Sequence, residues 1–336
     1  MECSEKPVFH NYTRQELMQI RITPPDEAVR KRVKKHWDTL AKPLDGMGCF
    51  ETITAQIGAI LGTDVIDIRK KGVLIFCADN GIVEEGVTQS GQEVTAAVAR
   101  SIAGRHSSVC QMAEVAGADI IPVDIGIQNR EEIHGVLNKK IRCGTRNFLK
   151  EPAMTQEETI RAMAVGMELV RTLKEEGYRI LATGEMGIGN TTTSSAVASV
   201  LLGKEPEELT GRGAGLDDSG LQKKIQAICT GIEKHHPRPD DPVDVLAKVG
   251  GLDIAGMAGI CLGGAIEHIP VMLDGFISDV AALLAVHLCP AVKDYLLISH
   301  VSKEPGAGMV LRELTTEKAS DVHGMNLGMC LGEGTG

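Results

Sequence analysis

The sequence predicts an α/β fold: a doubly wound, mostly parallel sheet of the Rossmann-like kind, with a small helical domain drawn from both ends of the chain. Between residues 63 and 302, short apolar runs alternate with helical stretches, which is typical of βαβ units whose strands are buried on both faces. Small, acidic or hydroxyl residues follow these runs. We therefore expect residues 63–302 to form the α/β domain that carries the site, and residues 1–62 with 303–336 to form the helical domain.

The N-terminal region predicts helices only. "TRQELMQI" is followed by "PPDEAVRKRVKKHWDTLA", which places Pro25 near a helix start and Asp26 and Glu27 in the first turn; both features favour a helix N-terminus. A further helix is expected over Cys49–Leu61 and should end at Gly62, because glycine readily adopts the left-handed conformation that closes a helix.

Five short apolar runs predict the strands of the sheet. They are Val73–Cys77, Ile120–Val123, Ile180–Ala182, Val271–Leu273 and Tyr295–Ile298. "HHPRPDDP", residues 235–242, predicts a surface loop between two helices.

Composition and charge limit the function. The chain has 336 residues, of which 43% are hydrophobic and 24% charged, as in ordinary globular proteins. Aromatic residues make up 3% and the net charge is −10, which argues against base stacking, a nucleic-acid partner and an anionic membrane surface.

Cysteine usage and the chain start indicate the compartment. Nine cysteines are scattered without a C-x-x-C pair, which fits neither a disulfide framework nor a zinc site and favours a reducing cytosol. The histidines offer no metal-ligand spacing. No signal-peptide pattern is visible and the apolar stretches are too short to cross a bilayer. We expect a cytoplasmic protein without a bound metal.

The turns directly after the predicted strands indicate a common site. Ligands of open parallel sheets bind outside the carboxyl ends of the strands, so these turns should converge. Good turn-forming propensity of Asp and Gly explains any single turn, but not five together. The turns are residues 78–81, 124–126, 184–187, 274–276 and 299–302.

The most informative stretch is "GEMGIGNTTTSS", residues 184–195, which runs from a strand into a helix. Free backbone amides and the helix N-terminus make such a loop a natural seat for a phosphate monoester. It has no P-loop lysine and its glycines do not match G-x-G-x-x-G. The alternative is a tight turn with Thr and Ser as helix caps. Glu185 lies inside this loop, which suggests a separate task for its carboxylate.

Three further stretches carry candidate residues. "TGRGAGLDDSGLQKKI", residues 210–225, is a second glycine-rich loop entering a helix, where Lys224 offers a point charge to a phosphate; the alternative is a charged helix face. Asp274 follows a strand and suits ribose hydroxyls or a helix cap. Glu333 in "LGEGTG" lies between glycines, which suits a general base or a surface turn.

Taken in order, these stretches resemble one family, the nicotinate-nucleotide:dimethylbenzimidazole phosphoribosyltransferases, which prepare the lower-ligand nucleotide of cobamides. The resemblance covers nearly the whole chain beyond residue 40. The matching pieces are "ADNGIVEEGV" (78–87), "QEVT" (92–95), "GTRNF" (144–148), "GEMGIGNTT" (184–192), "TGRGAGLDD" (210–218), "GGLDIAGMAG" (250–259), "DGFISDVAALLA" (274–285), "SHVSKEPG" (299–306) and "LGEGTG" (331–336).

The resemblance implies that nicotinate leaves C1′ of nicotinate mononucleotide and that dimethylbenzimidazole, a related base or a phenol replaces it with inversion from β to α, without a cofactor. It implies that Glu333 is the general base, and that Glu185 stabilises positive charge growing on the ribosyl ring. Met186 lies in the candidate site next to Glu185, and Thr88 lies in the stretch that the resemblance places along the acceptor pocket. The other implied substrate-binding residues are Gly187, Gly189, Asn190, Thr191, Gly213, Lys224, Asp274, Ser302 and Gln92.

The chain departs from the family pattern in several places. The usual "SAYP" after "EGV" is here Thr88–Gly91, and the usual His of "ADHG" is Asn80. About five extra residues lie in the 315–323 region. Family chains continue past "GEGTG" with a helix, whereas this sequence ends at Gly336.

These departures leave alternatives open. The altered acceptor stretch makes the phenol-using branch of the family a serious alternative. In that branch two related chains form a heteromer, and only a phenolic acceptor such as p-cresol fits well. A catalytically silent subunit is disfavoured by the presence of both glutamates. A dinucleotide-binding oxidoreductase is a distant alternative. It would need G-x-G-x-x-G near the first strand and an acidic residue about 20 positions further on, and "CADNG" does not supply the glycines. The resemblance further implies a homodimer, or a heterodimer with a paralogous chain.

Overall fold

The protein, seen in a computed structural model, is described over residues 12–315, 324–329 and 331–336. Its centre is a six-stranded sheet in the order β3-β2-β1-β4-β5-β6, and every neighbouring pair is parallel. This is the order of a doubly wound sheet, so the predicted fold class is confirmed. The strands are β1 (Lys71–Ala78), β2 (Asp119–Gly126), β3 (Leu137–Asn138), β4 (Ile180–Met186), β5 (Val271–Leu273) and β6 (Leu296–Ile298).

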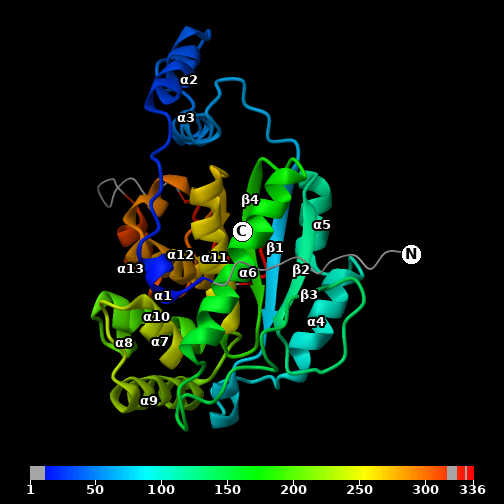
Figure 1. Ribbon diagram of the computed structural model, residues 1–336, viewed down its shortest axis with the longest axis vertical. Helices are drawn as coiled ribbons and strands as arrows, with labels where there is room; N and C mark the ends of the chain where they lie inside the picture. The colour runs from blue at the N-terminus through cyan, green and yellow to red at the C-terminus, as the bar shows by residue number, and fades with distance from the viewer. Residues whose placement is uncertain (1–11, 316–323, 330) are drawn as a thin grey trace.

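Helices surround this sheet (Figure 1). None of those that the structure describes is both long and apolar enough to cross a bilayer. The α-helices are α1 (Arg14–Met18), α2 (Glu27–Thr39), α3 (Cys49–Leu61), α4 (Glu93–Ala103), α5 (Ser108–Ala116), α6 (Gln156–Glu175), α7 (Asn190–Leu202), α8 (Pro206–Leu209), α9 (Asp218–His235), α10 (Pro242–Val249), α11 (Leu252–Glu267), α12 (Phe276–Leu288) and α13 (Ala307–Leu314), with 3₁₀ turns η1 (Gly81–Glu85) and η2 (Pro290–Tyr295).

All five predicted strands form, and β3 is the addition that the sequence did not reveal. It has two exposed residues, too few for any periodicity to show, and it exists because β2 offers it hydrogen bonds. The predicted loop at 235–242 connects α9 to α10. Most of the 315–323 region, where extra residues were expected, lies outside the described residues.

Strand β1 is buried on both faces, as the apolar run predicted. Leu74 and Phe76 point into one core, together with side chains of α6, α7, α11 and α12. Val73, Ile75 and Cys77 point into the other, which α4 and α5 cover. The alternation follows from the two-residue period of a strand. Figure 1 shows these two sets of helices on opposite sides of β1.

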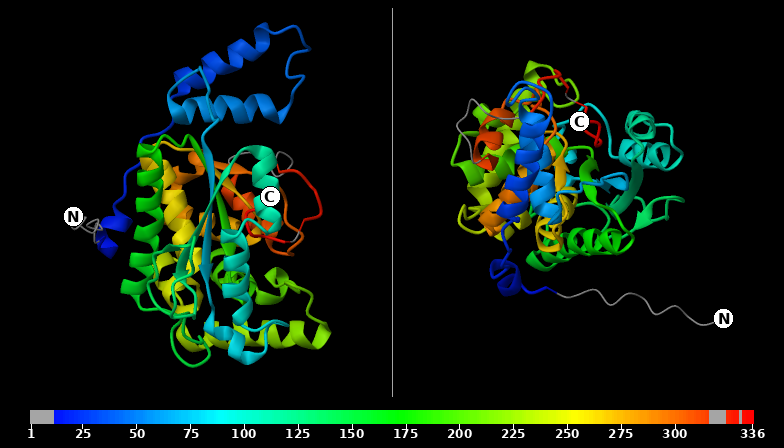
Figure 2. Two further views of the ribbon diagram at one scale, coloured as in Figure 1. Left: turned by 90° about the vertical axis from the view of Figure 1, so that its right-hand side faces the viewer. Right: turned by 90° about the horizontal axis from the view of Figure 1, so that it is seen from above.

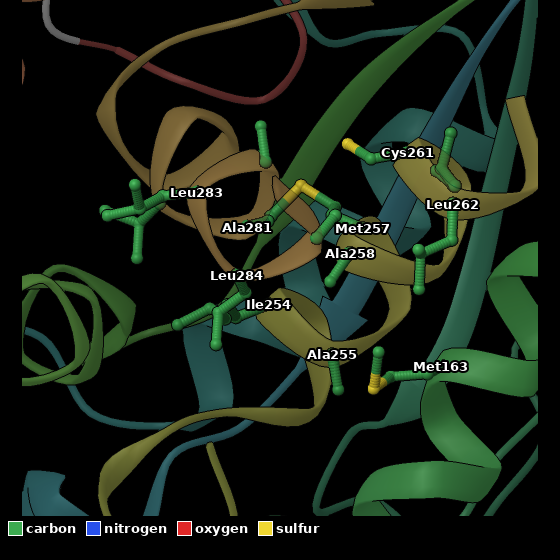
Figure 3. Close-up of a cluster of buried hydrophobic side chains, with 14 of the residues drawn as sticks. Met163, Ile254, Ala255, Met257, Ala258, Cys261, Leu262, Ala281, Leu283 and Leu284 are labelled. Atoms are coloured by element: carbon green, nitrogen blue, oxygen red, sulfur yellow. The ribbon is translucent and has the colours of Figure 1, made fainter. Parts of the chain in front are cut away.

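Helices α6 and α11 approach each other closely because glycines face each other at their crossing. A Cβ on Gly166 would collide with the Gly256 carbonyl oxygen, and a Cβ on Gly259 would collide with the Met163 carbonyl oxygen. Next to this crossing, aliphatic and sulfur side chains such as Met257 fill the space between α6, α11 and α12 (Figure 3). This close contact packs α6 and α11 together on the face of the sheet toward which Leu74 and Phe76 point.

Helices α2 and α3 form a hairpin that projects beyond the α/β body (Figures 1 and 2). Helix α3 spans Cys49–Leu61 as predicted and ends at Gly62, whose φ of 67° is left-handed. Its Ile57 contacts the sheet beside Ile180 and Leu297. At the other end of the chain, α13 packs against α12. The division into domains at residues 62 and 303 stays a prediction.

Candidate active site

A cavity of about 360 Å³ lies at the carboxyl ends of β4, β5 and β6. Its size is that of a small-molecule site. Twelve of the thirteen predicted site residues line it, namely Thr88, Glu185, Met186, Gly187, Gly189, Asn190, Thr191, Gly213, Lys224, Asp274, Ser302 and Glu333. The thirteenth, Gln92, instead donates a hydrogen bond from Nε2 to the Asn80 carbonyl oxygen at 3.0 Å.

Three of the five turns that were expected to converge supply lining residues: those after β4, β5 and β6. The carboxylates near the ends of β1 and β2 instead accept hydrogen bonds from backbone N–H groups that follow β2. Asp79 accepts a hydrogen bond from the Gln128 N–H at 2.8 Å. Asp124 accepts one from the Ile127 N–H at 2.9 Å and forms an ion pair with Lys140. The expectation of a five-turn site was therefore wrong for β1 and β2.

The loop after β4 needs its glycines because it passes close to β1. A Cβ on Gly187 would collide with the Ala78 carbonyl oxygen, and one on Gly189 would lie 2.8 Å from Val83 Cγ2. Gly189 also has a φ of 91°, which an L side chain rarely adopts. Helix α7 then begins at Asn190 with its N-terminus at the cavity. The loop therefore presents a helix N-terminus, which favours an anion.

Lys224 provides a buried cation beside this N-terminus. It lies on α9, is 1% exposed and lines the cavity. Its Nζ donates hydrogen bonds to Thr191 Oγ1 at 2.9 Å and to the Gly211 carbonyl oxygen at 3.0 Å, which uses two of its three donors. Burial lowers the pKa of Lys224 to about 8, and the Glu304 carboxylate opposes that shift. A phosphate bound here would favour the charged form.

Glu185 provides a buried carboxyl at the end of β4. It is 5% exposed, and its Oε2 accepts a hydrogen bond from Asn190 Nδ2. Burial first, and then the carboxylates of Asp253, Asp274 and Glu333, raise the pKa of Glu185 well above its usual range. These surroundings favour the neutral form of the carboxyl, and a cation beside it would favour the carboxylate.

Asp253 takes part in the same electrostatic cluster as Glu185. It is on α11, is 0% exposed, and its Oδ1 accepts the Ile254 N–H at 2.9 Å. Burial raises its pKa to about 6, against the hydrogen bonds from Ile254 and Asn190. The predicted phosphate-loop residue Asn190 therefore interacts with two carboxyl groups.

Glu333 reaches the cavity from the C-terminal segment, residues 331–336. It is half-buried and has a φ of 61°, uncommon for a residue with a side chain. Burial, and then the Asp274 carboxylate, raise its pKa. The neighbouring Gly332 approaches Glu185, since a Cβ there would lie 2.6 Å from Glu185 Oε1. The two glutamates that the sequence singled out are thus brought to one cavity although 148 positions separate them.

Apolar side chains form another part of the wall. They come from α4, from the residues before it and from the C-terminal segment, and include Val87, Val94, Val98 and Leu331. Thr88 lies beside them, and its Oγ1 donates to the Ser90 carbonyl oxygen at 2.7 Å. This part of the cavity can accept a flat apolar ring.

Sequence reasoning missed Arg212, His300 and Glu304, which also line the cavity. His300 and Glu304 belong to the "SHVSKEPG" stretch and Arg212 to "TGRGAGLDD", so their motifs had been noted but their side chains had not. Asp253 was missed because helix α11 has the composition of an apolar core helix. Its signal is an acidic residue within an otherwise buried stretch.

One acidic group outside the cavity has the spacing of metal ligands among the described residues: Asp38, Asp45 and Glu51 on the α2–α3 hairpin. Lys34 and Lys42 form ion pairs with Glu51 at 2.7 and 2.6 Å. Hydrogen bonds from these lysines lower the pKa of Glu51 to about 2. The lysines already balance this charge, and the group shares no residue with the cavity.

The fold and this cavity define an α/β protein with a small-molecule site that combines a buried lysine with buried carboxyl groups. The sequence model of the phosphoribosyltransferase family matches residues 22–336. The chain belongs to the nicotinate-nucleotide–dimethylbenzimidazole phosphoribosyltransferase family, and the resemblance seen in its motifs is confirmed. It is therefore an enzyme of the pentosyltransferase type.

Individual relatives agree with this assignment. The chain is 46% identical over 311 residues to the nicotinate-nucleotide–dimethylbenzimidazole phosphoribosyltransferase of Clostridium acetobutylicum, covering 93% of this chain and 87% of that one. The corresponding protein of Ruminiclostridium cellulolyticum is 45% identical, with 91% and 86% covered. The crystal structure of CobT from Thermus thermophilus matches with a TM-score of 0.85 at 35% identity, with 92% and 91% covered.

Proposed function

We propose that this protein moves the 5-phosphoribosyl group of nicotinate mononucleotide to a lower-ligand base, dimethylbenzimidazole or a related one, in cobamide biosynthesis. The products are an α-riboside 5′-phosphate and nicotinate. The names of its relatives support this choice of substrates. The observation that carries the proposal is a single cavity that combines the cation Lys224 with the carboxyl groups of Glu185 and Glu333.

The phosphate end of the substrate is assigned to the α7 N-terminus and Lys224. The helix N-terminus favours a dianionic phosphate, and Lys224 adds a buried positive charge beside Thr191. Gly213 lies next to them, since a Cβ on it would be 3.0 Å from Thr191 Oγ1, so the loop backbone can approach the phosphate closely. Neither part needs a metal ion.

The anomeric carbon of the substrate is assigned to the part of the cavity that holds the carboxyl groups of Glu185 and Glu333. The pyridinium ring of the substrate is positively charged, so its binding beside Glu185 favours the carboxylate form. That carboxylate then stabilises the oxocarbenium-like charge that develops as nicotinate leaves. Because the nicotinate ring departs from one face of the ribose, the acceptor attacks from the other and the configuration inverts.

Glu333 is assigned as the general base that takes the proton of the acceptor. A base is effective when its pKa lies near the working pH, and burial raises the pKa of Glu333 in that direction. The apolar wall that includes Val94 and Val98 suits the acceptor ring, and excluding water there protects the reactive ribosyl group from hydrolysis.

A nicotinate-release assay tests the proposal. The protein is mixed with nicotinate mononucleotide and a panel of benzimidazoles, purines and phenols, and the same panel is run with the Glu333→Gln variant. We expect acceptor-dependent nicotinate release by the native protein and strong loss in the variant. Absence of release with every acceptor, from protein shown to bind nicotinate mononucleotide, would contradict the proposal.

A phenol-accepting subunit of a heterodimer is the second candidate. It is favoured by the Thr88–Gly91 stretch, which departs from the family pattern and supplies Thr88, Gln89 and Ser90 to the cavity wall. Turnover of p-cresol only after addition of a paralogous chain would support it. Turnover of dimethylbenzimidazole by the single chain would favour the first candidate.

We also propose that the working form is a dimer, either a homodimer or a heterodimer with a paralogous chain, located in the cytoplasm. The hairpin exposes large apolar side chains, with Leu44 at 74% and Phe50 at 59%, and such clusters often mark protein contacts. Light scattering on the native protein and on Phe50→Asp tests this, since the variant should lose mass if the hairpin forms the contact. A native monomer would contradict it.

A further inference from the structure

We propose that Asp274 is a positioning residue whose main task is to hold the C-terminal segment, and with it Glu333, over the cavity. This inference rests on the proposed role of Glu333. It differs from the expectation that the Asp274 side chain binds ribose hydroxyls, because each of its carboxylate oxygens already accepts a hydrogen bond from the backbone of residues 331–336.

The two oxygens accept hydrogen bonds from two backbone groups of the segment. The Gly334 N–H donates to Asp274 Oδ2 at 2.9 Å, and the Gly336 N–H donates to Oδ1 at 2.6 Å. Hydrogen bonds to a charged acceptor are stronger than those between neutral groups. Asp274 is 4% exposed, so water competes little for these bonds.

The segment needs such an anchor because its own backbone is irregular. Gly332, Glu333 and Gly334 have φ values of 82°, 61° and 81°, which neither a helix nor a strand accommodates. Within the segment, Thr335 closes a turn by donating from its N–H and its Oγ1 to the Gly332 carbonyl oxygen. The turn shapes the segment but does not attach it to the sheet.

Asp274 itself is firmly placed. It follows β5 directly, its N–H donates to Thr183 Oγ1 at 3.3 Å, and its carbonyl oxygen accepts from Ser299 Oγ at 3.1 Å. Thr183 belongs to β4 and Ser299 directly follows β6, the two strands that neighbour β5. The anchor therefore transmits the position of the sheet edge to the segment.

Close packing between Gly334 of the segment and Gly184 of β4 requires glycine at both positions. A Cβ on Gly334 would lie 2.8 Å from Val73 Cγ1, and a Cβ on Gly184 would lie 3.0 Å from the Gly334 Cα. The segment thus lies against β4 and β1 without side chains between the backbones of Gly184 and Gly334. Asp274 fixes its lateral position, which decides where the Glu333 carboxylate points.

The test uses Asp274→Asn in the full chain, because an amide keeps the shape and replaces one acceptor oxygen with a donor. We expect amide exchange in residues 331–336 to become at least about tenfold faster, as the loss of a charged hydrogen bond requires. We expect kcat to fall about 10²-fold, since small displacements of a catalytic group have effects of that size, while the Kd of nicotinate mononucleotide changes little.

A double-variant cycle separates positioning from substrate binding. If Asp274 acts through Glu333, then Asp274→Asn combined with Glu333→Gln is no slower than Glu333→Gln alone. Multiplicative losses, or a tenfold weaker Kd with unchanged amide exchange, would overturn the proposal. Asp274→Ser repeats the cycle should the Asn variant fail to fold.

Asp124→Asn is the matched control. Asp124 also lies near the end of a strand and accepts a hydrogen bond from a backbone N–H, but it does not line the cavity. It should leave exchange in residues 331–336 unchanged. Because amide exchange needs no substrate, this arm tests the anchor even if the native protein releases no nicotinate, so failure of the inference and failure of the proposed function are distinguishable.

Discussion

The two ends of the cavity are built in different ways. The phosphate end consists of a helix N-terminus and Lys224, both held by regular helices close to the 184–225 stretch. The other end, which holds the carboxyl groups, brings together Glu185, Asp274 and Glu333 from three segments that lie far apart in the sequence. The first end is a local structure that the α/β body stabilises, whereas the second exists only once the C-terminal segment has docked.

The electrostatics of the two ends differ in the same sense. Burial lowers the pKa of Lys224 to about 8 and raises the pKa of Glu185 well above its usual range. The protein surroundings thus shift both groups toward their neutral forms. A phosphate at one end and a cationic ring at the other stabilise the charged forms of Lys224 and Glu185, which favours a ligand that carries both over one that carries a single charge.

The difference between the two ends predicts that a substitution can abolish catalysis without weakening the binding of nicotinate mononucleotide. Glu333→Gln should lower kcat by about 10²–10⁴-fold, the usual contribution of a general base. The Kd of nicotinate mononucleotide should stay nearly constant, because the phosphate end is intact. Single-turnover nicotinate release and calorimetry measure the two quantities. An equal loss in both would mean that the two ends do not act separately.

The reverse is expected at the phosphate end. Lys224→Met keeps much of the buried side-chain volume and removes the charge, so the Kd of nicotinate mononucleotide should weaken about 10–100-fold, with a smaller effect on kcat. Lys223→Met is the control, because Lys223 is exposed on the same helix. A larger loss in kcat than in affinity would remove the distinction between the ends.

The buried carboxylate of Asp253, which acts on Glu185, should lower the stability of the fold at high pH. Burial raises the pKa of Asp253 from 3.8 to about 6, so the folded state holds this proton more tightly than the unfolded state. The associated stability is present below about pH 4 and is lost as the pH rises through about 6. Asp253→Asn should therefore gain stability relative to the native protein, on the order of 2–3 kcal/mol more at pH 8 than at pH 4.

Thermal or denaturant unfolding of both proteins at the two pH values measures this difference. The comparison between pH values is its own control, because any fixed packing cost of the substitution cancels. If the difference in unfolding free energy between the native protein and the variant does not change with pH, Asp253 is not the group whose ionisation lowers stability.

The smallest predicted effect is a pH dependence of affinity at the phosphate end. Lys224 has a pKa of about 8, and only its charged form attracts the phosphate. Affinity for nicotinate mononucleotide should fall about tenfold between about pH 7.5 and 9.5. In Lys224→Met the Kd should be flat over this range, and a slope that persists in the variant would assign the titration to another group.

Much of this architecture could be predicted from residues near one another in the chain. The apolar runs marked the five strands that carry the sheet, and Gly62 marked the end of α3. The glycines at 187 and 189 marked the start of α7. Gln92 shows the limit of such prediction, because a motif position does not reveal that the side chain turns to the Asn80 carbonyl oxygen.

The amino-acid sequence by itself determined the alternation of strands and helices, the two glycine-rich loops and the resemblance to one enzyme family, because periodicity and turn preference act over a few residues. Only the tertiary structure decided that Asp274 holds Gly334, 60 positions away, and that the charge of Asp253 acts on Glu185. Those contacts depend on strand order and on which sheet edge a distant segment reaches, and no short stretch of chain encodes either of them.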